Sequence, residues 1–99
     1  MLEAGETVAI RAVVAGKVQG VGFRFFVSGL AKDLGITGSV KNLNDGTVEV
    51  KAYASKGTVE LMVEQLRQGP PRSFVSDVDV VWLPKQTEVD RPVNFTILR

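Results

Sequence analysis

The 99-residue chain contains no cysteine and no histidine. Without cysteine it can form no disulfide, no thiolate nucleophile and no cysteine-ligated metal site, a composition compatible with a reducing compartment. Without histidine it lacks the commonest general base, the commonest zinc ligand and any phosphohistidine intermediate. Any chemistry must therefore rest on Arg, Lys, Asn, Gln, Ser, Thr, carboxylates and the backbone.

The chain also has little net charge and no long apolar run. The formal net charge is +1 with 23% charged residues, so there is no strong electrostatic footprint for nucleic acid or for an anionic membrane surface. No apolar run is long enough to span a bilayer, and the acidic start MLEAGETV does not resemble a targeting peptide. We expect a single domain over residues 1–99, cytoplasmic and monomeric, with no membrane or nucleic-acid partner.

The most informative stretch is GKVQGVGFR, residues 16–24, which places three glycines between an alternating apolar run and a helical pattern. Glycines let successive amide groups turn inward, and the following helix adds its free N-terminal donors. Arg24 falls in the first helical turn, where a cation opposes the helix dipole unless an anion offsets it. The stretch predicts a phosphate cradle. The alternative is a plain strand-to-helix turn with an exposed arginine.

Hydrophobic periodicity predicts five strands and two helices. The expected strands cover residues 7–14, 38–43, 47–54, 76–82 and 93–98, and the expected helices run from Phe23 to about Leu34 and from a Ser55 cap to Gly69. Asp45 and Gly46 between the second and third strands favour a type I′ hairpin turn. The segment 84–92 is polar and turn-rich.

This order predicts an α+β fold of the ferredoxin-like, split β-α-β type, with an antiparallel sheet and two helices on one face. Right-handed crossovers place the first and third strands side by side. The partner of the short fifth strand stays open. The glycine stretch then lies near the end of the second strand, where Asn42 interrupts a small and apolar series. Asn42 is either a site residue or the start of the turn.

The glycine stretch and the hairpin together resemble the acylphosphatase family. The matching residues are Gly16, Val18, Gln19, Gly20, Val21, Phe23 and Arg24, then Gly38, Val40, Asn42, Asp45, Gly46, Val48 and Glu49. The resemblance extends from about Val8 to Arg99. Two positions depart from the pattern, Ser39 where the family often has tryptophan and Asn44 where it often has proline. These departures bear on packing and turn stiffness.

The resemblance implies an acylphosphatase, which hydrolyses small acyl phosphates to a carboxylate and inorganic phosphate. Water would be the direct nucleophile, without metal, cofactor or phosphoenzyme. The implied catalytic residues are Arg24, which binds the phosphoryl group, and Asn42, which holds the attacking water. The implied phosphate-binding residues are Lys17, Gln19, Gly20, Val21, Gly22, Phe23 and Arg24. A planar guanidinium suits two phosphoryl oxygens, and phosphoryl transfer asks a protein mainly for positioning and charge stabilisation.

The sequence also permits four other interpretations. A non-catalytic regulatory module would bind phosphate or a phosphorylated metabolite in the same cradle without turnover. Asp45 could accept a phosphoryl group or bind magnesium, although Asp-Gly at a hairpin tip favours turn chemistry. Asp77 and Asp79 could bind a metal, although a solvated strand face is expected there. An RNA-binding sheet is disfavoured, because Tyr53 is the only aromatic residue on the exposed face of the third strand.

Overall fold

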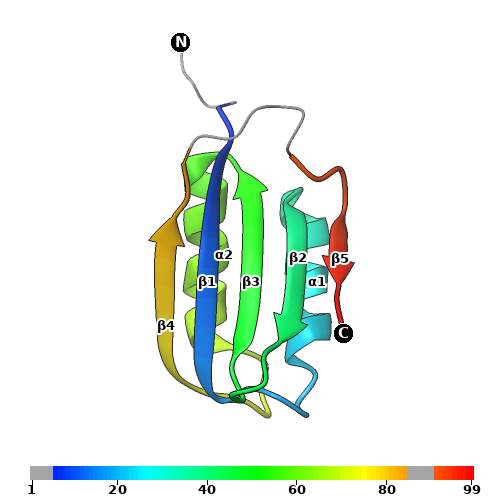
Figure 1. Cartoon of the computed structure of the whole chain (residues 1–99), viewed down its shortest axis with the longest axis vertical. Coiled ribbons are helices and arrows are strands. Elements are labelled where there is room, and N and C mark those ends of the chain that lie inside the picture. The colour runs from blue at the N-terminus through cyan, green and yellow to red at the C-terminus, as the bar shows by residue number, and fades with distance from the viewer. Residues whose placement is uncertain (1–5, 85–90) are drawn as a thin grey trace.

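The computed structural model describes residues 6–84 and 91–99, which form one five-stranded sheet and two helices. The strands are β1 (Val8–Lys17), β2 (Thr37–Asn42), β3 (Val48–Ala54), β4 (Phe74–Trp82) and β5 (Phe95–Ile97), and the helices are α1 (Phe23–Leu34) and α2 (Lys56–Gln68). The sheet order is β4-β1-β3-β2-β5, and both helices cover one face of it (Figure 1). The predicted ferredoxin-like fold is confirmed, including the adjacent β1 and β3.

The sheet is mixed rather than antiparallel throughout. β1 pairs antiparallel with β3 and β4, and β2 with β3, as predicted. β5 instead runs parallel to β2, with Gly38 opposite Phe95 and Val40 opposite Ile97. The Gly38 N–H donates to the Asn94 carbonyl (3.0 Å), and the Leu98 N–H donates to the Val40 carbonyl (2.8 Å). The predicted antiparallel arrangement is confirmed for β1 to β4. β5, whose partner the sequence pattern left open, adds a parallel edge strand next to β2.

The core lies between the sheet and the two helices. Ile10, Ala12 and Val14 alternate along β1 and are fully buried on the helix-covered face. Each helix contributes one apolar stripe, formed by Phe23, Val27 and Ala31 on α1 and by Val59, Met62 and Leu66 on α2. Burial of this layer fixes α1 against the sheet, so the first turn of α1 has a defined position at the sheet's end.

The helix ends follow the sequence signals in part. Gly35 ends α1 with φ 71°, and its N–H and that of Ile36 donate back to the last carbonyls of the helix. Ser55 is the N-cap residue of α2, but its hydroxyl bonds the Thr58 hydroxyl (2.9 Å) rather than a backbone amide. Within the described ranges, neither helix is both long and apolar enough to cross a membrane.

Two strands are longer than their periodicity predicts. β1 continues to Lys17, because the register with β4 shifts between Ala15 and Gly16 and pairing resumes after the shift. A Cβ atom on Gly16 would lie 2.1 Å from the Phe74 carbonyl oxygen, so only glycine fits at this point of the bulge. β4 accordingly starts at Phe74. The predicted segment 84–92 falls largely on residues 85–90, which lie outside the described residues, as do residues 1–5 of the acidic start.

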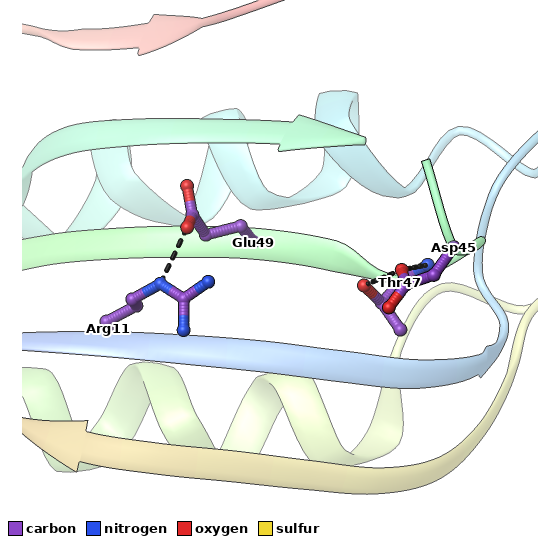
Figure 2. A network of polar contacts seen from close by, with 4 residues as sticks. All are labelled: Arg11, Asp45, Thr47 and Glu49. Carbon is purple, nitrogen blue, oxygen red and sulfur yellow. Dashed lines mark hydrogen bonds and ion pairs between the residues drawn. The ribbon is translucent and has the colours of Figure 1, made fainter. Parts of the chain in front are cut away.

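The β2–β3 connection does not form the predicted type I′ turn. The Leu43 N–H donates to the Thr47 carbonyl (2.8 Å), which leaves Asn44, Asp45 and Gly46 at the tip of the hairpin. Gly46 has φ 94°, whereas neither Asn44 nor Asp45 has the positive φ that a type I′ turn requires. The Asp45 carboxylate accepts hydrogen bonds from the Thr47 hydroxyl (2.6 Å) and amide (3.0 Å) (Figure 2). These two bonds, the hydroxyl's first, lower the pKa of Asp45 from its ordinary value of 3.8.

The sheet face opposite the helices carries a buried charge, Glu49. Glu49 is 8% exposed and accepts a 2.6 Å ion-paired hydrogen bond from Arg11 Nε (Figure 2). Arg11 sits directly opposite Lys51, a like charge, so its diagonal reach to Glu49 offsets an unfavourable cross-strand pair. The pair joins β1 to β3 on a face that the pattern had predicted to be largely wet.

Candidate active site

The glycine loop connects β1 to α1 through residues 18–22 and leaves the helix without a side-chain cap. Gly22 is the N-cap residue, in the left-handed conformation with φ 80° and ψ 20°. The first hydrogen bond of this end runs from the Phe26 N–H to the Gly22 carbonyl (3.0 Å). The amides before Phe26 have no intrahelical acceptor, so the start of α1 offers donors and the positive end of the helix dipole.

Beside this loop lies a pocket of about 510 Å³, which we call the loop pocket. Its lining comes from the glycine loop, the first turn of α1, the end of β2 and the segment around β5: Val18, Gly20, Gly22, Phe23, Arg24, Phe25, Asn42, Ile97 and Arg99. The loop, the end of β2 and the end of β5 all lie at the same end of the sheet (Figure 1). Arg24 and Asn42, predicted from separate blocks of sequence, thus line one pocket.

Arg24 is half-buried, and the polypeptide after β5 orients it. Its Nη1 donates a 3.1 Å hydrogen bond to the Leu98 carbonyl oxygen. Helical side chains lean toward the N-terminus, which carries this guanidinium back over the glycine loop. A guanidinium has further N–H donors, which this single bond leaves for an oxyanion in the pocket.

Gln19 links the glycine loop to the β2–β3 hairpin. Its Nε2 donates to the carbonyl oxygens of Leu43 (2.8 Å) and Thr47 (2.9 Å). Leu43 directly follows Asn42, so the bond sets the distance between the loop and the residue predicted to hold water. The Gln19 side chain is thereby directed at the hairpin.

The predicted phosphate-binding residues divide into two groups. Gly20, Gly22, Phe23 and Arg24 line the loop pocket, whereas Lys17, Gln19 and Val21 do not. Lys17 ends β1 opposite Phe74 and is exposed, and Val21 is half-buried against the core. Phe23 is a core residue by its side chain, so any contribution to an anion comes from its backbone amide.

Four pocket residues were not among the predicted site residues: Val18, Phe25, Ile97 and Arg99. Ile97 and Arg99 reach the pocket only because β5 pairs with β2, which no pattern in the sequence indicates. Phe25 had a detectable signal. It lies outside the apolar stripe of α1 and is 79% exposed, an uncommon environment for a large aromatic side chain.

The carboxylates considered as rival sites are placed elsewhere. Asp45 sits in the β2–β3 turn, bonded to Thr47 and exposed, as its turn interpretation predicts. Asp77 and Asp79 are exposed on β4, at the edge of the sheet. Among residues 6–84 and 91–99, no three His, Cys, Asp or Glu side chains gather in a group that could hold a metal ion.

The arrangement is that of a known family of small α+β proteins. The family model of acylphosphatases matches residues 10–97. An acylphosphatase of Bifidobacterium longum is 44% identical over 91 residues, which cover 92% of this chain and 94% of that protein. An acylphosphatase of Archaeoglobus fulgidus is 38% identical over 90 residues, covering 91% and 97%.

A solved structure agrees in fold as well as in sequence. The crystal structure of acylphosphatase from Bacillus subtilis superposes with a TM-score of 0.86 at 36% identity, over 93% of this chain and 99% of that one. The chain therefore belongs to the acylphosphatase family, as the resemblance of the two sequence blocks predicted.

Proposed function

We propose that the protein is an acylphosphatase that hydrolyses small acyl phosphates, with Arg24 and Asn42 as its catalytic residues. The observation that carries the proposal is that both side chains line the loop pocket, next to the uncapped start of α1. A guanidinium, free backbone donors and a helix N-terminus together suit the phosphoryl group. Membership of the family supports the reaction type.

In the proposed reaction, the phosphoryl group lies against Arg24 and the amides of the glycine loop. The Asn42 side chain orients a water molecule whose oxygen forms a new bond to phosphorus. The bond from phosphorus to the acyl oxygen breaks, and the carboxylate leaves with the electron pair. One proton of the water moves to a phosphoryl oxygen, so an acyl phosphate dianion and water give a carboxylate and dihydrogen phosphate.

This chemistry suits a chain without histidine. A carboxylate is a good leaving group, so no side chain has to protonate it, and an amide can orient water although it is a poor base. The loose transition state spreads charge over the equatorial phosphoryl oxygens, where the Arg24 guanidinium stabilises it. The proposal includes no metal ion or other cofactor. It places the enzyme in the cytoplasm as a monomer, with the acyl phosphate as its ligand and no nucleic-acid or membrane partner.

The test is hydrolysis of benzoyl phosphate in the presence of a chelator. Wild type should turn over. Arg24→Ala should lose both turnover and affinity for inorganic phosphate, because removing a charge-assisted clamp costs on the order of 2 to 5 kcal/mol. Asn42→Ala should lower kcat while leaving inhibition by phosphate near the wild-type value, because Asn42 contacts the water rather than the phosphoryl group.

Two matched variants control for charge and for general destabilisation. Lys32→Ala removes one positive charge from the last turn of the same helix, away from the loop pocket, and Asn44→Ala truncates the exposed turn next to Asn42. Both should keep wild-type kinetics. Equal activity of wild type, Arg24→Ala and Asn42→Ala would reject the assignment. Phosphate binding by wild type without any turnover would instead favour a non-catalytic phosphate-binding module.

A further inference from the structure

Phe25 is an aromatic side chain that the fold does not use. It is 79% exposed, whereas Phe23 two positions earlier is 2% exposed and forms an edge-to-face contact with Phe26 in the core. Burying a phenyl side chain stabilises a protein by about 1.5 to 3 kcal/mol, and Phe25 obtains little of this. Its exposure is therefore not explained by packing within the chain.

The position of Phe25 points to the loop pocket. It directly follows Arg24 in the first turn of α1, and both side chains line that pocket. Ile97 lines it from β5, is 38% exposed, and is also apolar. The loop pocket thus has two chemically different parts. Arg24, Asn42 and the glycine-loop backbone form the polar part, and Phe25 and Ile97 form the apolar part.

We infer that Phe25 and Ile97 form the acyl-group subsite, so that the enzyme favours acyl phosphates with apolar, preferably aromatic, acyl groups over those with a single methyl group. The inference rests on the proposed function, because it divides one substrate between the two parts of the pocket. With the phosphoryl group at Arg24, the acyl group extends from the same phosphorus atom and needs a neighbouring surface. A planar acyl ring can stack on Phe25 and exclude water from both apolar faces.

The test compares benzoyl phosphate with acetyl phosphate, which differ in the acyl group alone. Wild type should have the higher kcat/KM for benzoyl phosphate. Phe25→Ala should lower kcat/KM for benzoyl phosphate by about tenfold, mainly through KM, because it removes apolar contact from the ground state and the transition state alike. Its kcat/KM for acetyl phosphate should fall by a clearly smaller factor, because a methyl group contacts less of the ring. Its inhibition by inorganic phosphate, which carries no acyl group, should change by less than about twofold. For benzoyl phosphate, the kcat/KM of Phe25→Leu should lie between those of wild type and Phe25→Ala.

A second measurement does not depend on turnover. Phenylphosphonate should inhibit wild type more strongly than methylphosphonate, and Phe25→Ala should remove most of that difference. Phe74→Ala is the matched control, since Phe74 is 67% exposed at the start of β4 and does not line the loop pocket. It should keep both the substrate ratio and the inhibitor ratio of wild type. Phe25→Ala should also unfold at the wild-type temperature, because an exposed ring contributes little to the core.

The outcomes separate this inference from the proposed function. If wild type hydrolyses both substrates but Phe25→Ala keeps the wild-type ratios for substrates and phosphonates, the acyl subsite is wrong and the proposed function stands. If wild type hydrolyses neither substrate, the proposed function itself fails, and the inference fails with it.

Discussion

Arg24 shows how a single residue depends on distant parts of the chain. α1 supplies its backbone position, the glycine loop supplies the neighbouring amides, and the Leu98 carbonyl holds one of its nitrogen atoms at 3.1 Å. A flexible arginine loses conformational entropy when it binds an anion, and a side chain held in place beforehand loses less. The bond to Leu98 therefore favours anion binding without touching the anion.

At the same scale, Asp45 makes stability depend on pH. Its pKa is lowered in the folded protein, mainly by the Thr47 hydroxyl and next by the Thr47 amide. The unfolded state therefore binds more protons around this pKa, and the stabilising contribution of Asp45 is present above pH 3.8 and is lost as the pH falls through the folded pKa. A carboxyl NMR titration should give Asp45 a pKa below 3.8.

Thr47→Val provides the control for this titration, because it removes the hydroxyl, keeps the backbone amide and has nearly the same shape. It should raise the pKa of Asp45 toward the ordinary value of 3.8, and denaturant unfolding should lose part of its dependence on acidic pH. A pKa of 3.8 or higher for Asp45 in the wild-type protein would contradict the prediction.

Individual residues were predictable where the local pattern carried the signal. The glycine spacing and Arg24 in the first helical turn indicated an anion site from neighbouring residues alone. Asn42 interrupts an apolar series, but its proposed role came from the family resemblance rather than from this local pattern. Burial of Glu49 could not be predicted in this way, because its ion-pair partner Arg11 lies on another strand. Phe25 was overlooked because its significance depends on Ile97, a residue distant in sequence that lines the same pocket.

At the scale of elements, the glycine loop and the β2–β3 hairpin act as one unit. Gln19 joins them through two hydrogen bonds from one amide nitrogen. The loop carries the phosphate-binding amides of the proposed site, and the hairpin's first strand ends in Asn42. The relative placement of these two elements should therefore affect both stability and catalysis.

Gln19→Ala should lower the free energy of unfolding by about 1 to 3 kcal/mol, because it leaves the Leu43 carbonyl without this donor. It should also raise KM for benzoyl phosphate, because the loop is no longer tied to the hairpin. Urea unfolding and steady-state kinetics measure the two effects. Gln68→Ala, at the exposed end of α2, is the control and should change neither. Wild-type KM and stability in Gln19→Ala would show that the two bonds do not position the loop.

The elements themselves were largely predictable. α1 begins and ends where its apolar stripe and Gly35 indicate, and the hairpin lies at Asp45 and Gly46 although its turn type differs. β1 is longer than predicted because a bulge at Gly16 interrupts the alternation that defines a strand in sequence. The pairing of β5 was not predictable, since three residues carry too little periodicity and parallel pairing depends on the whole topology.

At the scale of the whole molecule, anion binding should be linked to folding stability. The loop pocket is lined by residues as far apart in sequence as Val18 and Arg99, so it exists in the folded protein and not in the unfolded chain. Inorganic phosphate at about 100 times its Kd should raise the free energy of unfolding by about 2.7 kcal/mol. Thermal unfolding in phosphate, against chloride at equal ionic strength, measures the effect. Arg24→Ala should abolish the difference, whereas Lys32→Ala should keep it. A phosphate-independent unfolding temperature for wild type would contradict the prediction.

The bond between Arg24 and the Leu98 carbonyl spans 74 positions in sequence. We expect this contact to form after the central strands have paired, because the three-residue β5 offers few contacts to offset the entropy of closing so long a loop. A partly folded molecule in which β5 has not yet paired with β2 would already contain the glycine loop, but would lack Ile97 and the Leu98 carbonyl at the pocket. Recovery of catalytic activity during refolding should therefore follow the docking of β5. The rate at which hydrolysis returns would then report the rate at which β5 pairs with β2.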